Sequence, residues 1–235
     1  MALPVIARPV STVELLSNPI EVTVQAFTMK EQKPLLMIKD SDDTKGILQN
    51  VLKLVQNCVV SPKTLDVGNL PVFDLVKLFI EIIGISKGTV QNIYYKCNKC
   101  SHRIEKSVDL SLTEYGDVQK APLIKVNDTI AIKLRYPSLK NIIDIISSDD
   151  EDTDNKLLCS CIYQVYNGQD DITNYNDVSF DELYNWYLEL PQKTIDEMQD
   201  FFVKIPQPKL KVELACPKCG QTDTIEYTNF FNFFG

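Results

Sequence analysis

The segments Cys97-Asn98-Lys99-Cys100 and Cys216-Pro217-Lys218-Cys219 contain four of the seven cysteines of this chain. In each segment, a tight turn with two intervening residues lets both thiolates point to one side. Two such turns supply four sulfurs, the ligand set of a tetrahedral zinc-ribbon site. We therefore predict a structural zinc site whose ligands are Cys97, Cys100, Cys216 and Cys219.

Each cysteine pair lies between two segments whose residues are typical of strands. Residues 90–96 and 103–112 flank the first pair, and residues 210–215 and 222–227 flank the second. Because 115 residues separate the two pairs, the chain between them must fold as an insertion. A shared metal ion would then tie the centre of the chain to its C-terminal region.

Two other interpretations of the cysteine pairs stay open: knuckles that hold no metal, and redox-active thiols. The redox interpretation has less support, because a thioredoxin-type pair begins a helix, whose dipole lowers a thiol pKa. His102 is the only histidine and an alternative ligand, although a solvent-facing strand residue is the simpler interpretation. Cys58 and Cys161 are expected to be core residues.

The remaining apolar patterns predict an α+β fold of amphipathic helices and small antiparallel hairpins. A strand is expected at 20–27 and a hairpin at 124–134. Thr28 and Glu31 form a capping pattern that predicts a helix start at residue 28. Pro34 favours a helix that starts later than this. The expected helices span residues 28–38, 41–58, 71–83, 139–146, 157–167, 179–187 and 194–205.

These elements divide the chain into four regions. Residues 1–89 form a strand and helices, and residues 90–136 form the central hairpin region with the first knuckle. Residues 137–207 are expected to be helical, with a solvated acidic loop at 147–155. Residues 208–235 contain the second knuckle hairpin and an aromatic tail, which pack with residues 90–112.

The aromatic tail has two interpretations. Four phenylalanines between Phe230 and Phe234 either fill the core against the helix of Phe201 and Phe202 or form an apolar patch for a partner subunit. Packing is the favoured interpretation, because large exposed apolar patches are rare on monomers.

Composition limits the classes of partner. The chain has 235 residues, of which 44% are hydrophobic, and its formal net charge is −8. An acidic surface repels phosphate backbones, so we expect protein partners and neither a nucleic-acid partner nor a small-molecule substrate. The N-terminus lacks the pattern of a signal peptide, and no apolar run is long enough for a membrane span, so we expect a cytoplasmic protein.

Catalytic motifs are not apparent. A single histidine leaves serine or cysteine triads with one candidate base, and glycine-rich phosphate loops and the H-E-x-x-H motif do not occur. We therefore predict a protein that is not an enzyme and has no catalytic or cofactor-binding residues. The alternative is an enzyme whose catalytic carboxylates form a site that no sequence motif reveals.

Several short motifs occur in the order seen in one phage family. They are Lys30-Glu31 through Leu36, Leu70-Pro71-Val72-Phe73-Asp74, Lys133-Leu134-Arg135-Tyr136-Pro137, Cys161-Ile162 through Gly168, Phe201-Phe202 through Pro206, Cys216-Pro217-Lys218-Cys219-Gly220 and Phe233-Phe234. Taken together, the chain resembles the baseplate hub-subunit and hub-assembly family of T-even-like contractile-tailed phages.

The resemblance implies a non-enzymatic structural or assembly protein of the phage baseplate hub. Its partners would be other tail and baseplate hub proteins. It would act in the host cytoplasm during assembly, either as an assembly chaperone or as a hub subunit that stays in the virion tail. A zinc-ribbon adaptor that binds nucleic acid or transcription machinery is the alternative from another class.

Overall fold

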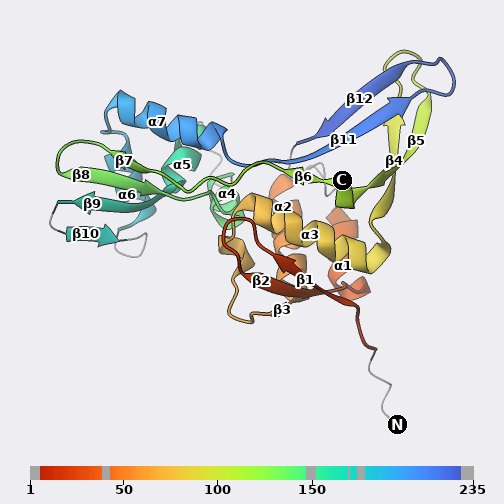
Figure 1. Ribbon diagram of the computed structural model, residues 1–235, viewed down its shortest axis with the longest axis horizontal. Helices are drawn as coiled ribbons and strands as arrows, with labels where there is room; N and C mark the ends of the chain where they lie inside the picture. The colour runs from red at the N-terminus through yellow and green to blue at the C-terminus, as the bar shows by residue number, and fades with distance from the viewer. Residues whose placement is uncertain (1–5, 39–42, 147–151, 169, 174–177, 229–235) are drawn as a thin grey trace, which may run out of the picture. The chain divides into compact units, whose positions relative to one another are not determined.

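The computed structural model describes residues 6–38, 43–146, 152–168, 170–173 and 178–228. The chain folds into two compact units (Figure 1). Unit 1 comprises Met1–Val67, Phe73–Gly116 and Gln207–Gly235, and unit 2 comprises Gly68–Val72 and Asp117–Pro206. Most of unit 2 is therefore inserted, in sequence, between the two cysteine pairs of unit 1.

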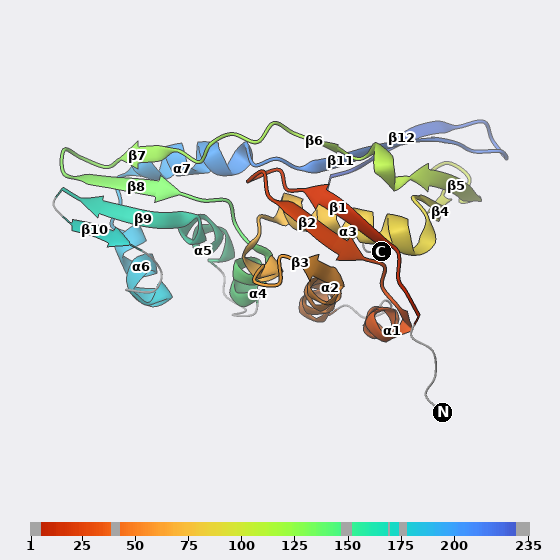
Figure 2. The same cartoon turned by 60° about the horizontal axis from the view of Figure 1, so that its bottom comes forward.

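Unit 1 begins with an antiparallel sheet in the order β1-β2-β3, formed by β1 (Val10–Glu14), β2 (Glu21–Gln25) and β3 (Val59–Ser61). Its helices are α1 (Met29–Ile38), α2 (Thr44–Cys58) and α3 (Val72–Lys87). The sheet lies along α3 (Figure 2). Apolar side chains buried in this unit include Val22, Val24, Leu48, Val51, Leu54, Val55, Leu75, Leu78 and Ile82.

A buried carboxylate joins α3 to the turn between β1 and β2. Asp74 is fully buried, and its Oδ1 accepts a hydrogen bond from the Leu16 N–H at 2.5 Å. Its Oδ2 accepts a second one from the Ser17 N–H at 3.2 Å. Two backbone donors that water cannot reach well are thereby satisfied, so this turn is fixed to the first turn of α3.

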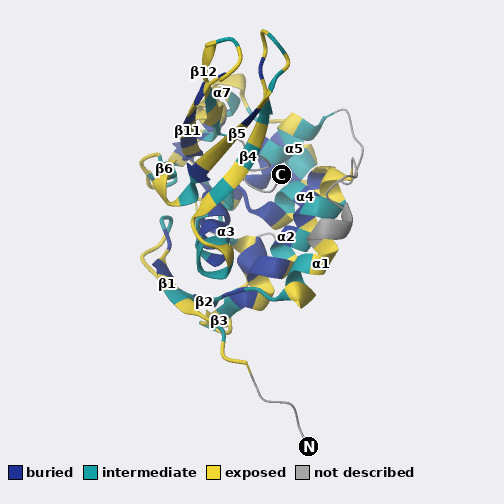
Figure 3. Ribbon diagram, turned by 90° about the vertical axis from the view of Figure 1, so that its right-hand side faces the viewer, coloured by how far each residue is buried: buried dark blue, intermediate teal, exposed yellow. Residues whose placement is uncertain are grey.

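Two hairpins complete unit 1. The first consists of β4 (Val90–Lys96) and β5 (Arg103–Asp109), followed by the short helix η2 (Leu110–Leu112). The second consists of β11 (Pro208–Ala215) and β12 (Thr222–Tyr227), and β11 also pairs with β6 (Glu114–Tyr115). Figure 3 shows the hairpins projecting side by side from the helical part of the unit.

Alternate side chains of the hairpins form a small core between them. Leu210, Val212 and Leu214 of β11 are buried, and the residues between them are exposed. Ile104 and Val108 of β5 are also buried. Since β5 and β11 contact each other without strand pairing, the hairpins pack as two separate sheets.

Unit 2 contains an antiparallel sheet in the order β10-β9-β8-β7. Its strands are β7 (Leu123–Lys125), β8 (Ile130–Leu134), β9 (Ile162–Asn167) and β10 (Asp170–Thr173). Its helices are α4 (Leu139–Ile146), α5 (Thr153–Ser160), α6 (Phe180–Tyr187) and α7 (Gln192–Val203).

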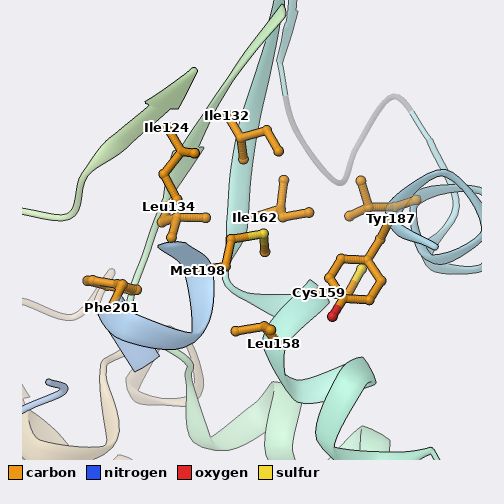
Figure 4. Packing of buried hydrophobic residues seen from close by; sticks show 10 residues of the cluster. Ile124, Ile132, Leu134, Leu158, Cys159, Ile162, Tyr187, Met198 and Phe201 are labelled. Carbon is orange, nitrogen blue, oxygen red and sulfur yellow. The ribbon is translucent and has the colours of Figure 1, made fainter. Parts of the chain in front are cut away.

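One hydrophobic cluster holds unit 2 together (Figure 4). Residues from three of its strands pack with residues from α5, α6 and α7, which gives the inserted unit a core of its own. The main members are Ile124, Ile132, Leu134, Leu158, Cys159, Ile162, Leu183, Tyr187, Met198 and Phe201.

The predicted α+β class is confirmed, and so are both cysteine hairpins and most helices. Three helix boundaries predicted from sequence are wrong. The helix expected at 157–167 ends at Ser160, because Ile162–Asn167 pairs with β8 and β10. α3 continues past Gly84 to Lys87. α7 begins at Gln192 and not at Thr194, which is a buried residue within the helix.

Pro34 lies inside α1, which starts at Met29, directly after the capping residue Thr28, so the later start expected from this proline is wrong. Residues 147–151 of the acidic loop and the aromatic residues 229–235 lie outside the described part of the chain. No helix of the described residues has the length and apolar character that crossing a membrane needs.

The buried Asp74 gives the first testable prediction. Asp74→Ala leaves the Leu16 and Ser17 N–H groups without acceptors, so the free energy of unfolding should fall by about 2 kcal/mol. Chemical denaturation measures this change. The exposed Glu21→Ala is the control and should change stability by less than about 0.5 kcal/mol. Equal effects of the two substitutions would contradict an anchoring role for Asp74.

Candidate metal centre

The four predicted ligands come together at the tips of the two hairpins. The sulfur atoms of Cys97, Cys100, Cys216 and Cys219 all lie within 4.8 Å of one another. The Sγ of Cys97 is 3.7 Å from that of Cys219, and the Sγ of Cys100 is 3.6 Å from that of Cys216. The four cysteines therefore lie close enough to bind one metal ion.

The sulfur spacing fits a tetrahedral site. With zinc–sulfur bonds of about 2.3 Å, the sulfurs of a regular tetrahedron are separated by about 3.8 Å. The two shortest distances are close to this value and far longer than the S–S bond of about 2.05 Å in a disulfide. All four cysteines are free thiols. Cys97 and Cys216 are buried and the other two are half-buried, so the cluster is largely closed to water.

The two turns have the same backbone hydrogen bonds. In the first turn, the Cys97 N–H donates to the His102 carbonyl at 2.8 Å, and the Ser101 N–H donates to the Cys97 carbonyl at 2.9 Å. In the second, the Cys216 N–H donates to the Gln221 carbonyl at 2.8 Å, and the Gly220 N–H donates to the Cys216 carbonyl at 2.9 Å. The site is therefore built from two equivalent knuckles.

The residue after each second cysteine adopts a left-handed backbone conformation. This residue is Gly220 in the second knuckle, with φ of 68°, and Ser101 in the first, with φ of 55°. Glycine takes this conformation without steric cost, whereas a residue with a Cβ does not. Ser101 is the only described residue other than glycine with positive φ, so the first knuckle is the more strained of the two.

Backbone amides stabilise negative charge on one sulfur of each knuckle. The N–H groups of Cys100 and Lys99 point at the Cys97 sulfur and lower the pKa of its thiol to about 6. At Cys216, burial raises the pKa, but the N–H groups of Cys219 and Lys218 outweigh it and the net pKa is lowered.

The second cysteine of the first knuckle has the opposite pKa shift. At Cys100 the His102 N–H lowers the pKa, but burial and the other three sulfurs raise it, and the net pKa is about 12. The negative charge of neighbouring sulfurs disfavours a further thiolate beside them, and a positive charge at the centre would favour it. A bound metal ion would supply that charge.

Two further contacts join the hairpins. The Asn98 Nδ2 donates to the Asp223 Oδ2 at 2.9 Å, next to the sulfurs. The hydroxyl groups of Tyr95 and Tyr227 hydrogen-bond each other, and their rings meet edge to face with centroids 6.5 Å apart. Burial, followed by the bond to Tyr227, raises the pKa of Tyr95. These four residues were not predicted, because their residue types and spacing do not mark them as partners, unlike the two Cys-x-x-Cys pairs.

The other cysteines and the histidine are not part of the cluster. Cys58, Cys159 and Cys161 are buried, and burial raises the pKa of each thiol to about 12, as expected of core residues. His102 is half-buried and takes part in the first turn through its backbone, with its carbonyl accepting from Cys97 and its N–H directed at the Cys100 sulfur. Neither cysteine pair lies at a helix N-terminus, which the redox interpretation requires.

Comparison with known proteins identifies the family. The family model described as T4 bacteriophage base plate protein matches residues 8–235, which is nearly the whole chain. The chain belongs to this family. Neither a curated protein nor a solved structure matches the chain.

Membership gives this baseplate protein a structural role in a phage baseplate and associates it with other tail proteins of the virion. The match covers both cysteine pairs and the whole of unit 2. The family model therefore includes the cysteine cluster together with the inserted unit. The family description does not distinguish a hub subunit from other baseplate proteins.

The difference between Ser101 and Gly220 gives the second prediction. Ser101→Gly relieves the left-handed strain and should raise the free energy of unfolding by about 0.5 kcal/mol. Gly220→Ala should lower it by about 1 kcal/mol, although a Cβ there meets no atom within 4 Å.

Thermal unfolding of the metal-loaded baseplate protein measures both effects. Ser107→Gly, on the ordinary extended backbone of β5, is the control and should be destabilising, because it adds backbone freedom and removes the hydrogen bond from the Ser107 hydroxyl to Asn92. If Ser101→Gly destabilises the protein as much as Ser107→Gly does, the knuckle is not strained.

Proposed function

We propose that this protein is a non-enzymatic component of the phage baseplate hub, either a subunit or an assembly chaperone, which acts through protein–protein contacts. Family membership supports a baseplate role, and the order of motifs along the chain supports the hub. The observation that carries the proposal is the four-sulfur cluster, because it turns two separate hairpins into one rigid arm that a partner can bind.

We further propose that the metal is one structural zinc ion held by Cys97, Cys100, Cys216 and Cys219. Four thiolates in a closed tetrahedron are the ligand set of structural zinc, whereas a catalytic zinc keeps a position open for water. The sulfur distances of 3.6 and 3.7 Å support this geometry. When bound, the ion supplies folding energy and compensates the charge of the thiolates.

The distribution of charge supports protein partners over nucleic acid. Unit 2 contains 17 acidic and 8 basic residues, and unit 1 contains 15 acidic and 16 basic residues. The net charge of −8 therefore comes from unit 2. An excess of this size repels a phosphate backbone, so the nucleic-acid adaptor has less support than a hub protein. Assembly in the host cytoplasm, with or without retention in the virion tail, is part of the same proposal.

Elemental analysis tests the zinc site. The purified protein should contain about one zinc per chain, and Cys216→Ser should lose it, because three sulfurs do not complete the tetrahedron. The control Cys58→Ala removes a buried thiol of the same unit that is not in the cluster, so it should keep the zinc. Acidification should release the ion, because each thiolate takes up a proton.

Two results would contradict the zinc site. One is zinc content that Cys216→Ser does not change, which would remove this cysteine from the ligand set. The other is zinc loss in Cys58→Ala as well, which would mean that the metal content follows general stability and not the cluster.

Mass spectrometry of purified virions and of infected-cell extract tests the hub proposal. A hub subunit should be present in virions at a fixed ratio to other baseplate proteins, whereas an assembly chaperone should be confined to the extract. A chaperone should also be needed for baseplate assembly, so that tails do not form in its absence. A virion protein located only at the periphery of the baseplate would contradict both forms of the proposal.

A further inference from the structure

The outer edge of β4 has no strand partner among the described residues. The sheet of β4 and β5 has only two strands. The hydrogen bonds of Cys97 to His102 and of Leu110 to Thr89 fix which residues of β4 face β5. Because the direction alternates along an antiparallel strand, the N–H and C=O groups of Val90, Asn92, Tyr94 and Lys96 point away from β5, toward this open edge.

This edge lacks the features that prevent an exposed strand from pairing with a strand of another molecule. Val90 is 56% and Tyr94 is 54% exposed, Asn92 is exposed and uncharged, and Lys96 is a charge at the very end. Natural edges are protected by short length, charges or covering groups. A seven-residue strand with Lys96 as the single charge among its outward residues is therefore suited to pairing with another strand.

The other strand edges of unit 1 have such protection. On β12, the outward Thr224 N–H donates to the Asp223 Oδ1, and the outward Glu226 is charged. The outward positions of β5 include Arg103, Glu105 and Asp109, and β3 has only three residues. On β1, the Glu14 carbonyl accepts a hydrogen bond from Lys77 Nζ at 2.8 Å. Among the described strands of this unit, β4 thus combines the greatest length of unpaired edge with the least charge.

We propose that β4 pairs with β4 of a second copy of this chain. An antiparallel arrangement centred on Ile93 places Val90 opposite Lys96 of the second copy, and Asn92 opposite Tyr94. All four outward residues of each strand then exchange backbone hydrogen bonds, because they occupy positions of the same parity. Two marginal two-stranded sheets become one four-stranded sheet in the order β5-β4-β4-β5.

Charge complementarity supports a second copy as the occupant. Lys96 and Arg103 pair at one end of the hairpin, and Val90 and Asp109 pair at the other. The antiparallel arrangement places the Val90–Asp109 pair of one copy in line with the Lys96–Arg103 pair of the other. Asp109 then lies two strands, about 10 Å, from Lys96 of the second copy. This arrangement brings the cationic end of each hairpin to the anionic end of the other. The pairing does not depend on which metal ion the cysteines hold.

Sedimentation equilibrium of the full-length, metal-loaded protein tests the proposal. The mass should rise with concentration from 26.7 kDa toward twice that value. Hydrogen exchange should become slow in the dimer at the amides of Val90, Asn92, Tyr94 and Lys96, which the hairpin alone leaves exposed. The sedimentation experiment measures the mass of the dimer, and hydrogen exchange at these amides identifies its interface.

A proline at an outward position gives a sharp variant. Asn92→Pro removes an N–H that β5 does not use, so the hairpin can form while the second β4 cannot pair. This variant should be monomeric and should keep its far-ultraviolet circular dichroism and its metal content. Thr222→Pro is the matched control, because the Thr222 N–H also points away from β11 on the other hairpin, and this variant should still dimerise.

Three outcomes would overturn the proposal. The first is a monomer at every concentration, and the second is a dimer that Asn92→Pro leaves intact. The third concerns the chain's own C-terminal residues 229–235. If the full chain is monomeric and truncation after Thr228 makes it dimeric, those residues and not a second copy occupy the edge.

Discussion

Unit 1 depends on the meeting of four sulfurs at the tips of two hairpins that share no strand pairing. A two-stranded hairpin is marginal in water, and the core between these two consists of a few side chains such as Ile104 and Val212. Holding the tips together also closes a loop of more than a hundred residues, which is costly in chain entropy. A metal ion that binds only the closed arrangement would offset that cost.

The size of the insertion explains why unit 2 has its own core. Residues between the knuckles cannot rely on the metal, because no described residue outside the two pairs contributes a ligand to the cluster. They bury Ile132, Leu134 and Met198 in one cluster between a sheet and three helices instead. The acidic excess lies in this independently packed unit, so charge and metal binding are separated along the chain.

For a baseplate protein, this organisation has a simple consequence. A structural protein of a large assembly needs surfaces that keep their shape before the partner arrives, because ordering a flexible segment on binding weakens the complex. The contacts of Asn98 with Asp223 and of Tyr95 with Tyr227 reinforce the sulfur cluster, and together they fix the hairpins as one arm. The arm then presents β4 and its exposed Tyr94 as a defined edge.

Features that depend on neighbouring residues were predictable from local sequence patterns. The spacing of Cys97 and Cys100 and of Cys216 and Cys219, the alternation in the flanking strands and the capping box of Ser179 and Glu182 each predict a local structure that formed. Ile162 shows the limit of such patterns. A short apolar run is compatible with a helix or a strand. Here the segment that starts at Ile162 pairs with the edge of β8 and forms a strand.

Contacts between distant segments depend on how the whole chain folds. It paired Tyr95 with Tyr227, placed Asp74 under the turn of Leu16 and Ser17, and gave Ser101 the left-handed conformation that the sequence signals only at Gly220. Local propensity carries no information on these contacts, because their energy arises when burial removes polar groups from water and forces each to find a partner.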